Sequence, residues 1–230
     1  PPVYRTHHPP GMSPGSTASR PGPLLAAADR IYSTVRGDGT HAAYPHLGRD
    51  PIVAASHIII ALQSIVARNV DPLESAVITI GRIRGGDAGN VIPDSVQMVG
   101  TARTFSTKIQ DIVEARTIET SEAAARALGC AAEVTYKRDY PVTINAASET
   151  NIAADVARAV TGGEINTRIP PSMGAEDFSF ILNERPGAMI WIGNGDTANL
   201  HNPAYNFNDD IIPTGVSYWA QIVETSMPID

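Results

Sequence analysis

Two histidines near opposite ends of the chain could bind a divalent metal ion. His7 lies in the stretch THHPPGMSPG, and His201 follows the apolar run AMIWIG in the stretch LHNPAYNFND. A neutral imidazole in a loop held by proline is a good metal ligand, because little conformational entropy is lost on binding. Two isolated histidines do not form a metal motif, however, so surface histidines remain the alternative.

A third histidine, His41, follows a predicted strand in the sequence GDGTHAA. Small residues on both sides allow the backbone to bend sharply and leave the ring uncovered, so the imidazole could reach outward to a ligand. A plain surface histidine is the alternative. We expect His57 to be a packed or partly exposed helix residue, and His8 and His46 have no evident role.

Three further positions carry side chains that suit a bound substrate. Asn90 follows the turn GGDAG, and Arg103 lies thirteen residues later, near the end of a predicted strand. The planar guanidinium of arginine suits a carboxylate, although a surface salt bridge is the simpler explanation. The stretch GAEDF places Glu176 after small residues, where the alternative is a helix N-terminus that favours acidic side chains.

The elements that must position these residues form two patterns. With 230 residues, the chain can form one large domain or two modest ones. Hydrophobic periodicity predicts two helices separated by strands, in the order strand, helix, strand, strand, helix, strand over residues 31–140. The predicted helices are 50–69, which Asp50 and Pro51 should begin, and 108–129, which Gly129 should end. This order is typical of a ferredoxin-like sandwich.

The flanking segments are less complete. Residues 1–23 contain seven prolines and three glycines, so we expect a loop there. After residue 140 we expect a helix at 148–161, a loop at 167–182, a buried strand at 186–195 and a C-terminal amphipathic helix. These pieces predict part of an α/β layer that is too small for a complete sheet, which suggests missing material.

Composition excludes several functional classes. The net charge is −7 and no run is rich in lysine or arginine, which argues against nucleic acid as a partner. No apolar run approaches the roughly 20 residues that span a bilayer, so no membrane partner is expected. The single cysteine, Cys130, fits a reducing compartment, and a cytoplasmic location is expected. The chain does not begin with methionine, so we treat it as a possible fragment.

Taken together, the motifs are more specific than any one of them. The strings VRGDGTHAAYPH, GDAGNVIPD, GTARTFS, PPSMGAEDFSF, PGAMIWIGNG and LHNPAYNFND occur in one order, and they resemble the M20 metallopeptidase family in its amidohydrolase branch. That branch includes hippurate hydrolases, N-acyl-amino-acid deacylases and plant auxin-conjugate hydrolases. The resemblance implies an α/β fold, with a partial zinc-peptidase-like catalytic domain and an inserted ferredoxin-like lid that dimerises. The implied boundaries are 1–25 and 141–230 for the catalytic part and 26–140 for the lid.

The same resemblance implies roles for single residues. His7 and His201 match metal ligands, and His41 matches a lid histidine that reaches the partner's active site and polarises the scissile carbonyl. Asn90 and Arg103 match substrate-holding lid positions, Arg103 at the substrate carboxylate, and the backbone around Gly174 lines the pocket. Glu176 would contact a metal ligand rather than the metal. His8 stands where the branch has asparagine, which is a departure.

The motifs that are missing matter as much as those present. The branch carries a Cys-Gly-His-Asp stretch and a Glu-Glu pair, which supply further ligands and the general base, and this sequence has neither. The intact family uses two divalent ions to hydrolyse N-acyl amino acids. Histidine ligands suit Zn, Mn, Co and Ni alike. We therefore expect this chain alone to be inactive.

Three hypotheses follow: a fragment of such an enzyme, a non-catalytic protein that dimerises or binds another chain, or a split enzyme completed by a second polypeptide. A homodimer is expected, and its surface is left open between the helix 50–69 and the strand near 95–105.

Overall fold

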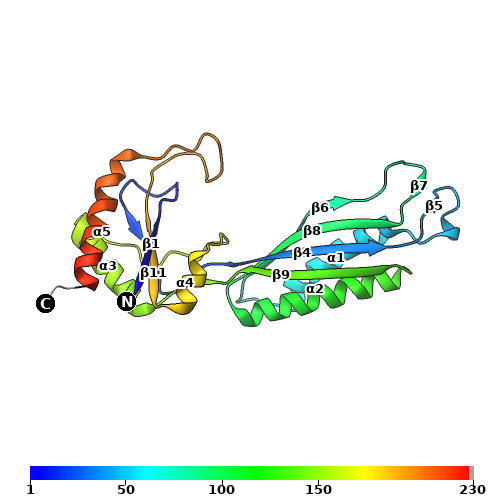
Figure 1. Cartoon of the computed structure of the whole chain (residues 1–230), viewed down its shortest axis with the longest axis horizontal. Helices are drawn as coiled ribbons and strands as arrows, with labels where there is room; N and C mark the ends of the chain where they lie inside the picture. The colour runs from blue at the N-terminus through cyan, green and yellow to red at the C-terminus, as the bar shows by residue number, and fades with distance from the viewer. Residues whose placement is uncertain (228–230) are drawn as a thin grey trace. The chain divides into compact units, whose positions relative to one another are not determined.

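The computed structural model describes residues 1–227 and divides the chain into two compact units (Figure 1). The first unit, called the split unit below, combines residues 1–25, 143–172 and the chain from 176 onward. The second, called the inserted unit, comprises residues 26–142 with 173–175. Residues 173–175 were predicted to belong with the C-terminal segment. They group with the inserted unit, where the carbonyl oxygen of Gly174 accepts a hydrogen bond from the Ala26 N–H at 2.9 Å.

The inserted unit has the predicted order of strands and helices. Its main elements are β4 (Ala27–Arg36), α1 (Pro51–Arg68), β6 (Ala76–Arg84), β8 (Ser95–Thr104), α2 (Thr107–Ala127) and β9 (Ala131–Tyr140). The sheet order is β6-β8-β4-β9, and all neighbouring strands are antiparallel. This is the ferredoxin-like arrangement, with α1 and α2 packed on the sheet (Figure 1).

Local signals in the sequence account for the two helices of the inserted unit. The Asp50 carboxylate accepts hydrogen bonds from the N–H groups of Ile52 and Val53 at 2.8 and 3.2 Å, and Pro51 occupies the first turn. Gly129, beyond the end of α2, has φ +74°, a conformation that favours glycine. The predicted start of α1 and the predicted glycine at the end of α2 are therefore confirmed.

Helix α1 corrects one expectation drawn from composition. Its 18 residues have a mean hydropathy of 1.5, which makes it long and apolar enough, by length and composition alone, to cross a membrane. A core helix of a soluble protein passes the same test. Ala54, Ile58, Leu62 and Ile65 of α1 are fully buried in the core of the inserted unit. Only 33% of the helix is buried, however, and Ile52, Val53 and Ile60 are exposed, so packing within this chain accounts for only part of its apolar content.

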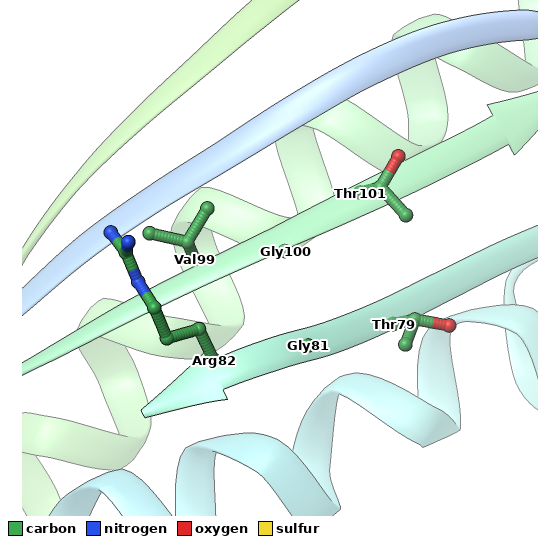
Figure 2. Close-up of a pocket in the computed structure, with 6 residues that line it drawn as sticks. All are labelled: Thr79, Gly81, Arg82, Val99, Gly100 and Thr101. Atoms are coloured by element: carbon green, nitrogen blue, oxygen red, sulfur yellow. The ribbon is translucent and has the colours of Figure 1, made fainter. Parts of the chain in front are cut away.

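The sheet of the inserted unit has one irregular edge. Strand β6 lies at that edge and its register with β8 shifts between Ile80 and Arg82, so Gly81 is the extra residue of a β-bulge. Figure 2 shows the shallow hollow at this point, where Gly81 and Gly100 carry no side chain and Arg82 borders the space. None of the predicted site residues lines it. Strand β8, which we considered as a dimer surface, lies between β6 and β4, so both of its edges are already paired.

A buried polar cluster lies on the helix side of the inserted sheet. Asp29 on β4 has no exposed surface, and its carboxylate accepts hydrogen bonds from Gln110 Nε2 at 2.9 and 3.0 Å and from the Tyr136 hydroxyl at 2.7 Å. Burial raises the pKa of Asp29, and the hydrogen bonds from Tyr136 and Gln110 and the charge of Arg138 oppose that rise. Asp29 therefore holds a proton more tightly in the folded chain than in the unfolded chain.

The split unit is built on a short sheet formed by distant segments. Strand β1 (Val3–His7) pairs in parallel with β11 (Gly187–Ile192), which also pairs with β2 (Thr17–Ala18). A second pair joins β3 (Gly22–Leu25) to β10 (Thr143–Asn145). The helices of this unit are α3 (Ala147–Thr161), α4 (Phe178–Glu184) and α5 (Ile212–Ser226), with a 3-10 turn, η2 (Asp209–Ile211), before α5. Residues 228–230 of the predicted C-terminal segment lie outside the described residues.

Two loop predictions in the split unit are wrong. The segment 1–23 contains strands, because β11 and β10 provide pairing partners that the local sequence does not reveal. The segment 167–182 contains the first turns of α4, where Ser179 Oγ donates to the carbonyl oxygen of Glu176 at 2.6 Å. The helix predicted at 148–161 and the strand predicted at 186–195 are confirmed as α3 and β11.

We predict that residues 26–142 fold on their own. These residues form two layers around a separate hydrophobic core, so a polypeptide of this range should give a circular dichroism spectrum with both helix and strand and should unfold cooperatively. Leu62→Ala in the same polypeptide should lower the free energy of unfolding by about 2–5 kcal/mol, because Leu62 is buried. A random-coil spectrum of the parent polypeptide would refute the prediction.

A second prediction concerns the pH dependence of stability. Because the pKa of Asp29 is raised in the folded state, its stabilising contribution is full below its ordinary pKa and is lost as pH rises through the raised value. The free energy lost in Asp29→Asn should therefore be larger near pH 4 than near pH 7. Urea unfolding of both proteins across this range measures the difference, and a difference that stays constant with pH would contradict the assignment.

Candidate functional site

His7, at the end of β1, is held by Glu176, which is itself paired with Arg5. Its Nε2–H donates to Glu176 Oε2 at 2.7 Å, and the other carboxylate oxygen, Oε1, lies 2.9 Å from Nη2 of Arg5. The Glu176 side chain is only 12% exposed, so these contacts occur in a partly dry environment. A carboxylate bound to one ring nitrogen fixes the tautomer and leaves Nδ1 of His7 as the free ligand atom.

His201 lies in the loop that follows β11. It is the only non-glycine residue among those described with a positive φ, at 65°. Such a conformation is uncommon for residues with a Cβ and is concentrated at functional sites. The structure therefore gives His201 a local feature that a plain surface histidine would not need.

The loop of His201 is anchored on the segment that follows His7. The Tyr205 hydroxyl donates to the carbonyl oxygen of His8 at 3.2 Å, and the ring of Phe207 meets the His8 ring edge to face at 5.6 Å. Buried Asn194 also accepts from the Asn208 N–H at 2.9 Å and donates to the carbonyl oxygen of Asn206 at 2.8 Å. The two predicted metal ligands therefore stand on adjoining loops.

These residues do not complete a metal site by themselves. Within residues 1–227 there is no group of three or more His, Cys, Asp or Glu side chains that could hold a metal ion. Glu176 already binds His7 and Arg5, and burial raises the pKa of the Cys130 thiol, which lies in the inserted unit. The described residues therefore supply too few donors for a complete metal centre, and no chemical step through a metal can be assigned to this chain alone.

The departure at His8 has a structural explanation. Burial lowers the pKa of His8, and the neighbouring His7 lowers it further. The Nδ1 atom of His8 is buried and has no hydrogen-bond partner, while the ring packs on Phe207. His8 is therefore a neutral packing residue that supports the loop of His201.

His41 and Asn90 are brought together at one end of the inserted unit. Strand β5 (Thr40–His41) pairs with β7 (Val91–Ile92), and the carbonyl oxygen of Asn90 accepts from the Ala42 N–H at 3.0 Å. His41 Nδ1 accepts a hydrogen bond from the Ala43 N–H at 3.0 Å. In the neutral ring the proton is therefore on Nε2, which leaves an outward N–H donor. Figure 1 shows β5 and β7 at the end of the sheet.

Arg103 lies at the opposite end of the same sheet. It pairs with Ala28 near the start of β4, whereas His41 follows Arg36 at the end of β4. The eight residue steps from Ala28 to Arg36 span about 27 Å in an extended strand. The guanidinium of Arg103 donates to Thr101 Oγ1 and to the carbonyl oxygen of Ala102, the latter at 3.0 Å. One chain therefore does not bring Arg103 together with His41 and Asn90.

Two residues near the predicted sites were missed from the sequence. Arg5 is two positions before His7, so both side chains lie on one face of β1, but this signal is visible only if residues 3–7 are recognised as a strand. Tyr44 packs its ring edge-on against His41 at 5.5 Å and against His46 at 6.5 Å. Tyr44 lies within the motif VRGDGTHAAYPH, but the motif resemblance implied no role for it.

Comparisons with known proteins agree with this architecture. The model of Peptidase family M20/M25/M40 matches residues 3–225. The N-acetyl-L-cysteine deacetylase of Bacillus subtilis (strain 168) is 37% identical over 210 residues, which cover 91% of this chain and 50% of that protein. The N-acetyldiaminopimelate deacetylase of Halalkalibacterium halodurans is 37% identical over 225 residues, covering 97% of this chain and 60% of that protein.

A solved structure extends the likeness to three dimensions. The crystal structure of the YXEP protein of Bacillus subtilis, described as a dinuclear metal binding peptidase from the M20 family, superposes with a TM-score of 0.81 at 27% identity. The likeness covers 98% of this chain and 57% of that one. The chain thus spans between half and three fifths of the length of these relatives.

The fold is that of a mixed α/β chain in which a split unit carries an inserted ferredoxin-like unit. The chain belongs to Peptidase family M20/M25/M40, in the amidohydrolase branch of its deacetylase relatives.

The contact between Glu176 and His7 yields a testable prediction. Glu176→Gln replaces a charge-assisted hydrogen bond by a neutral one, which is weaker by about 1 kcal/mol, so the preference of His7 for the Nε2–H tautomer should fall roughly fivefold. Imidazole ¹⁵N chemical shifts of the labelled chain, recorded above the ordinary imidazole pKa, report the tautomer directly.

The matched control is Asp177→Asn. Asp177 also contacts Arg5, at 3.3 Å, but its side chain is 69% exposed, and such surface pairs contribute little. This variant should leave the His7 signals unchanged. The assignment fails if Asp177→Asn shifts the tautomer and Glu176→Gln does not.

Proposed function

We propose that this chain supplies the lid and part of the catalytic domain of a metal-dependent amidohydrolase that cleaves N-acyl amino acids to a carboxylate and a free amino acid. The observation that carries the proposal is the His7 imidazole held by Glu176, with Nδ1 left free. The printed names of the relatives, which are deacetylases of N-acetylated amino acids, support the substrate class.

The metal ions belong to the same proposal. The family relative described as dinuclear supports two divalent ions in the complete enzyme, and imidazole ligands are compatible with Zn, Mn, Co or Ni. His7 and His201 would hold one side of that centre. Their loops adjoin each other, but the remaining ligands and the general base would have to come from another segment of polypeptide. The chain alone is therefore proposed to be inactive.

His41 would act as a hydrogen-bond donor in this reaction. The Ala43 N–H occupies Nδ1, so the neutral ring presents the Nε2 proton. A donor aimed at the oxygen of a scissile carbonyl stabilises the negative charge that develops when the carbon is attacked. Because Nδ1 is already occupied, His41 is poorly placed to act as a general base.

The positions of His41 and Arg103 support a homodimer. An N-acyl amino acid is about two residue lengths, or roughly 7 Å, whereas His41 and Arg103 are separated by nearly the full length of β4. A single small substrate cannot contact both in one chain. We propose that each active site takes Arg103 from one lid and His41 with Asn90 from another. Edge strand β6 and the exposed side of α1, including Ile60, would form the contact.

A non-catalytic protein that dimerises or binds another chain remains the alternative function. The observation that favours it is that the described residues form no group of three metal ligands. A split enzyme completed by a second polypeptide is the remaining hypothesis. These alternatives differ in whether activity appears when the missing segment is supplied.

We predict that the purified chain retains no tightly bound metal. After a challenge with zinc and manganese and exhaustive dialysis, elemental analysis should find far fewer than two ions per chain, and N-acetyl amino acids should not be hydrolysed. Replacing the matching 210 residues of the Bacillus subtilis deacetylase by this chain should give an active chimera. In that chimera His41→Ala should lower kcat by about 10²–10³-fold. Two ions bound by the isolated chain, or an inactive folded chimera, would contradict the proposal.

A further inference from the structure

The inserted sheet has one face covered by α1 and α2 and an opposite, outer face, and half of that outer face is positively charged. The charged residues of β6 and β8 are three arginines, Arg82, Arg84 and Arg103, and neither strand contains an acidic residue. Arg82 lies opposite Val99 on β8, and Arg84 lies opposite Gln97. The odd-numbered residues of β8 alternate with even-numbered residues that are buried toward the helices, so all three arginines lie on the outer face.

The other half of the outer face is electrically balanced. On β4 and β9 the outward lysine and arginines are all in ion pairs: Arg30 and Lys137 contact Asp139, at 2.5 and 3.1 Å, and Arg36 contacts Glu133 at 3.0 Å. Within residues 1–227, no ion pair involves the three arginines of β6 and β8. The free positive charge is therefore confined to one half of the face, where it favours an anionic ligand.

The guanidinium of Arg103 has one side occupied and one side free. Its Nη1 donates to Thr101 Oγ1 and, at 3.0 Å, to the carbonyl oxygen of Ala102. The Thr101 hydroxyl in turn donates to the carbonyl oxygen of Asp29 at 2.8 Å, which fixes its orientation. Among the described residues, Nε and Nη2 of Arg103 have no hydrogen-bond partner. These two atoms form the edge that binds a carboxylate through two parallel hydrogen bonds.

A hollow lies on the same half of the sheet, between Arg103 and Arg82. Its volume is about 350 Å³, near the lower end for small-molecule pockets, and its lining surface is almost wholly apolar. Figure 2 shows Thr101 with Thr79 at one end of the hollow, and Arg82 beside Val99 at the other, with the Arg82 side chain crossing β8. A Cβ at Gly81, the extra residue of the bulge, would meet no atom within 4 Å, so the space beside it is open.

The spacing of the two arginines selects the length of the ligand. Arg103 and Val99, which lies opposite Arg82, are four residue steps apart, or about 14 Å along β8. Each arginine side chain covers part of this distance. The remainder suits an amino acid whose side chain ends in an acidic group, because its two carboxylates are one to two residue lengths apart, or roughly 4–7 Å.

We propose that the hollow is a side-chain subsite for N-acyl amino acids whose side chain ends in a carboxylate. Nε and Nη2 of Arg103 bind the α-carboxylate, the methylene groups lie on the apolar floor, and Arg82 binds the terminal carboxylate. Arg84, on the same face, adds to the positive potential. The inference rests on the proposed function, because it takes Arg103 as the group that binds the α-carboxylate of the substrate. Its first test reads out binding rather than hydrolysis.

The experiment titrates the ¹⁵N-arginine-labelled 230-residue chain with N-acetyl-L-glutamate and, separately, with N-acetyl-L-glutamine at constant ionic strength. The two ligands have nearly the same shape and differ by the terminal charge. The Nε–H signals of Arg82 and Arg103 should shift, and N-acetyl-L-glutamate should bind roughly tenfold more tightly or better, because it gains a charge-assisted pair with Arg82. Arg82→Gln should bind both ligands equally. Arg82 is exposed, so this variant should keep the circular dichroism spectrum of the parent.

The matched control is Arg68→Gln, which removes the same charge from an exposed position at the end of α1 and should keep the tenfold preference. Equal binding of the two ligands by the parent overturns the proposal, as does a preference that survives Arg82→Gln. Inorganic sulfate that shifts the same signals with equal affinity also overturns it, since the patch would then be a general anion surface. Self-association that Arg82→Gln abolishes has the same consequence, because carboxylates of a second copy would then be the occupant.

The chimera with the Bacillus subtilis deacetylase separates this inference from the proposed function. In an active chimera, Arg82→Gln should lower the ratio of kcat/KM for N-acetyl-L-glutamate over N-acetyl-L-glutamine about tenfold or more, whereas Arg82→Lys should restore part of it. An active chimera whose ratio does not change contradicts the subsite and leaves the proposed function intact. An inactive folded chimera, with the binding preference present in the chain, contradicts the proposed function and supports the subsite.

Discussion

The side chain of Asn145 joins the three separate chain segments of the split unit. It is buried, and its Nδ2 donates to the carbonyl oxygens of Arg20 and Met189 at 3.0 and 3.1 Å, while its Oδ1 accepts from the Met189 N–H at 2.8 Å. These contacts fix β11 against the first segment, and the register of β11 then sets that of β1, in which His7 pairs with Trp191. Each hydrogen-bonding group of this buried amide that lost its partner would cost about 1–3 kcal/mol. The position of His7 therefore depends on the hydrogen bonds of Asn145.

The inserted unit is compatible with this arrangement because its two ends meet. Leu25 on β3 pairs with Thr143 on β10, so the chain leaves and re-enters the split unit at neighbouring strands. Closing a long excursion costs little more than closing a short one, since the entropy grows only with the logarithm of length. The insertion also has its own core and its own capped helices. Substitutions at His41 and Asn90 can therefore occur without altering the contacts that hold His7.

Sequence reasoning succeeded where local signals agree and failed where pairing is distant. The inserted unit was predicted almost element by element, because its periodic segments carry caps such as Asp50 and Gly129. Strand β1 was missed, because five residues among prolines become a strand only through pairing with residues 187–191. The same distance hid Arg5 from the site. Motif resemblance suggested Glu176 as a contact of a metal ligand, and the structure adds its partner, His7, but no local pattern predicts a contact across 169 positions.

The two proposed sites differ in what a second identical chain could supply. His41 and Arg103 lie at opposite ends of one sheet. Contacts across a two-fold axis are reciprocal. A second identical chain can therefore bring its His41 to the Arg103 of the first chain and its Arg103 to the His41 of the first chain. The metal centre proposed at His7 and His201 cannot be completed in this way, since a second copy brings the same two histidines and no further base. Within the split unit, the apolar groove lined by Tyr4, Trp219 and Val223 adjoins β1, which carries His7. An identical copy on the inserted unit would therefore leave the proposed metal centre on the split unit incomplete.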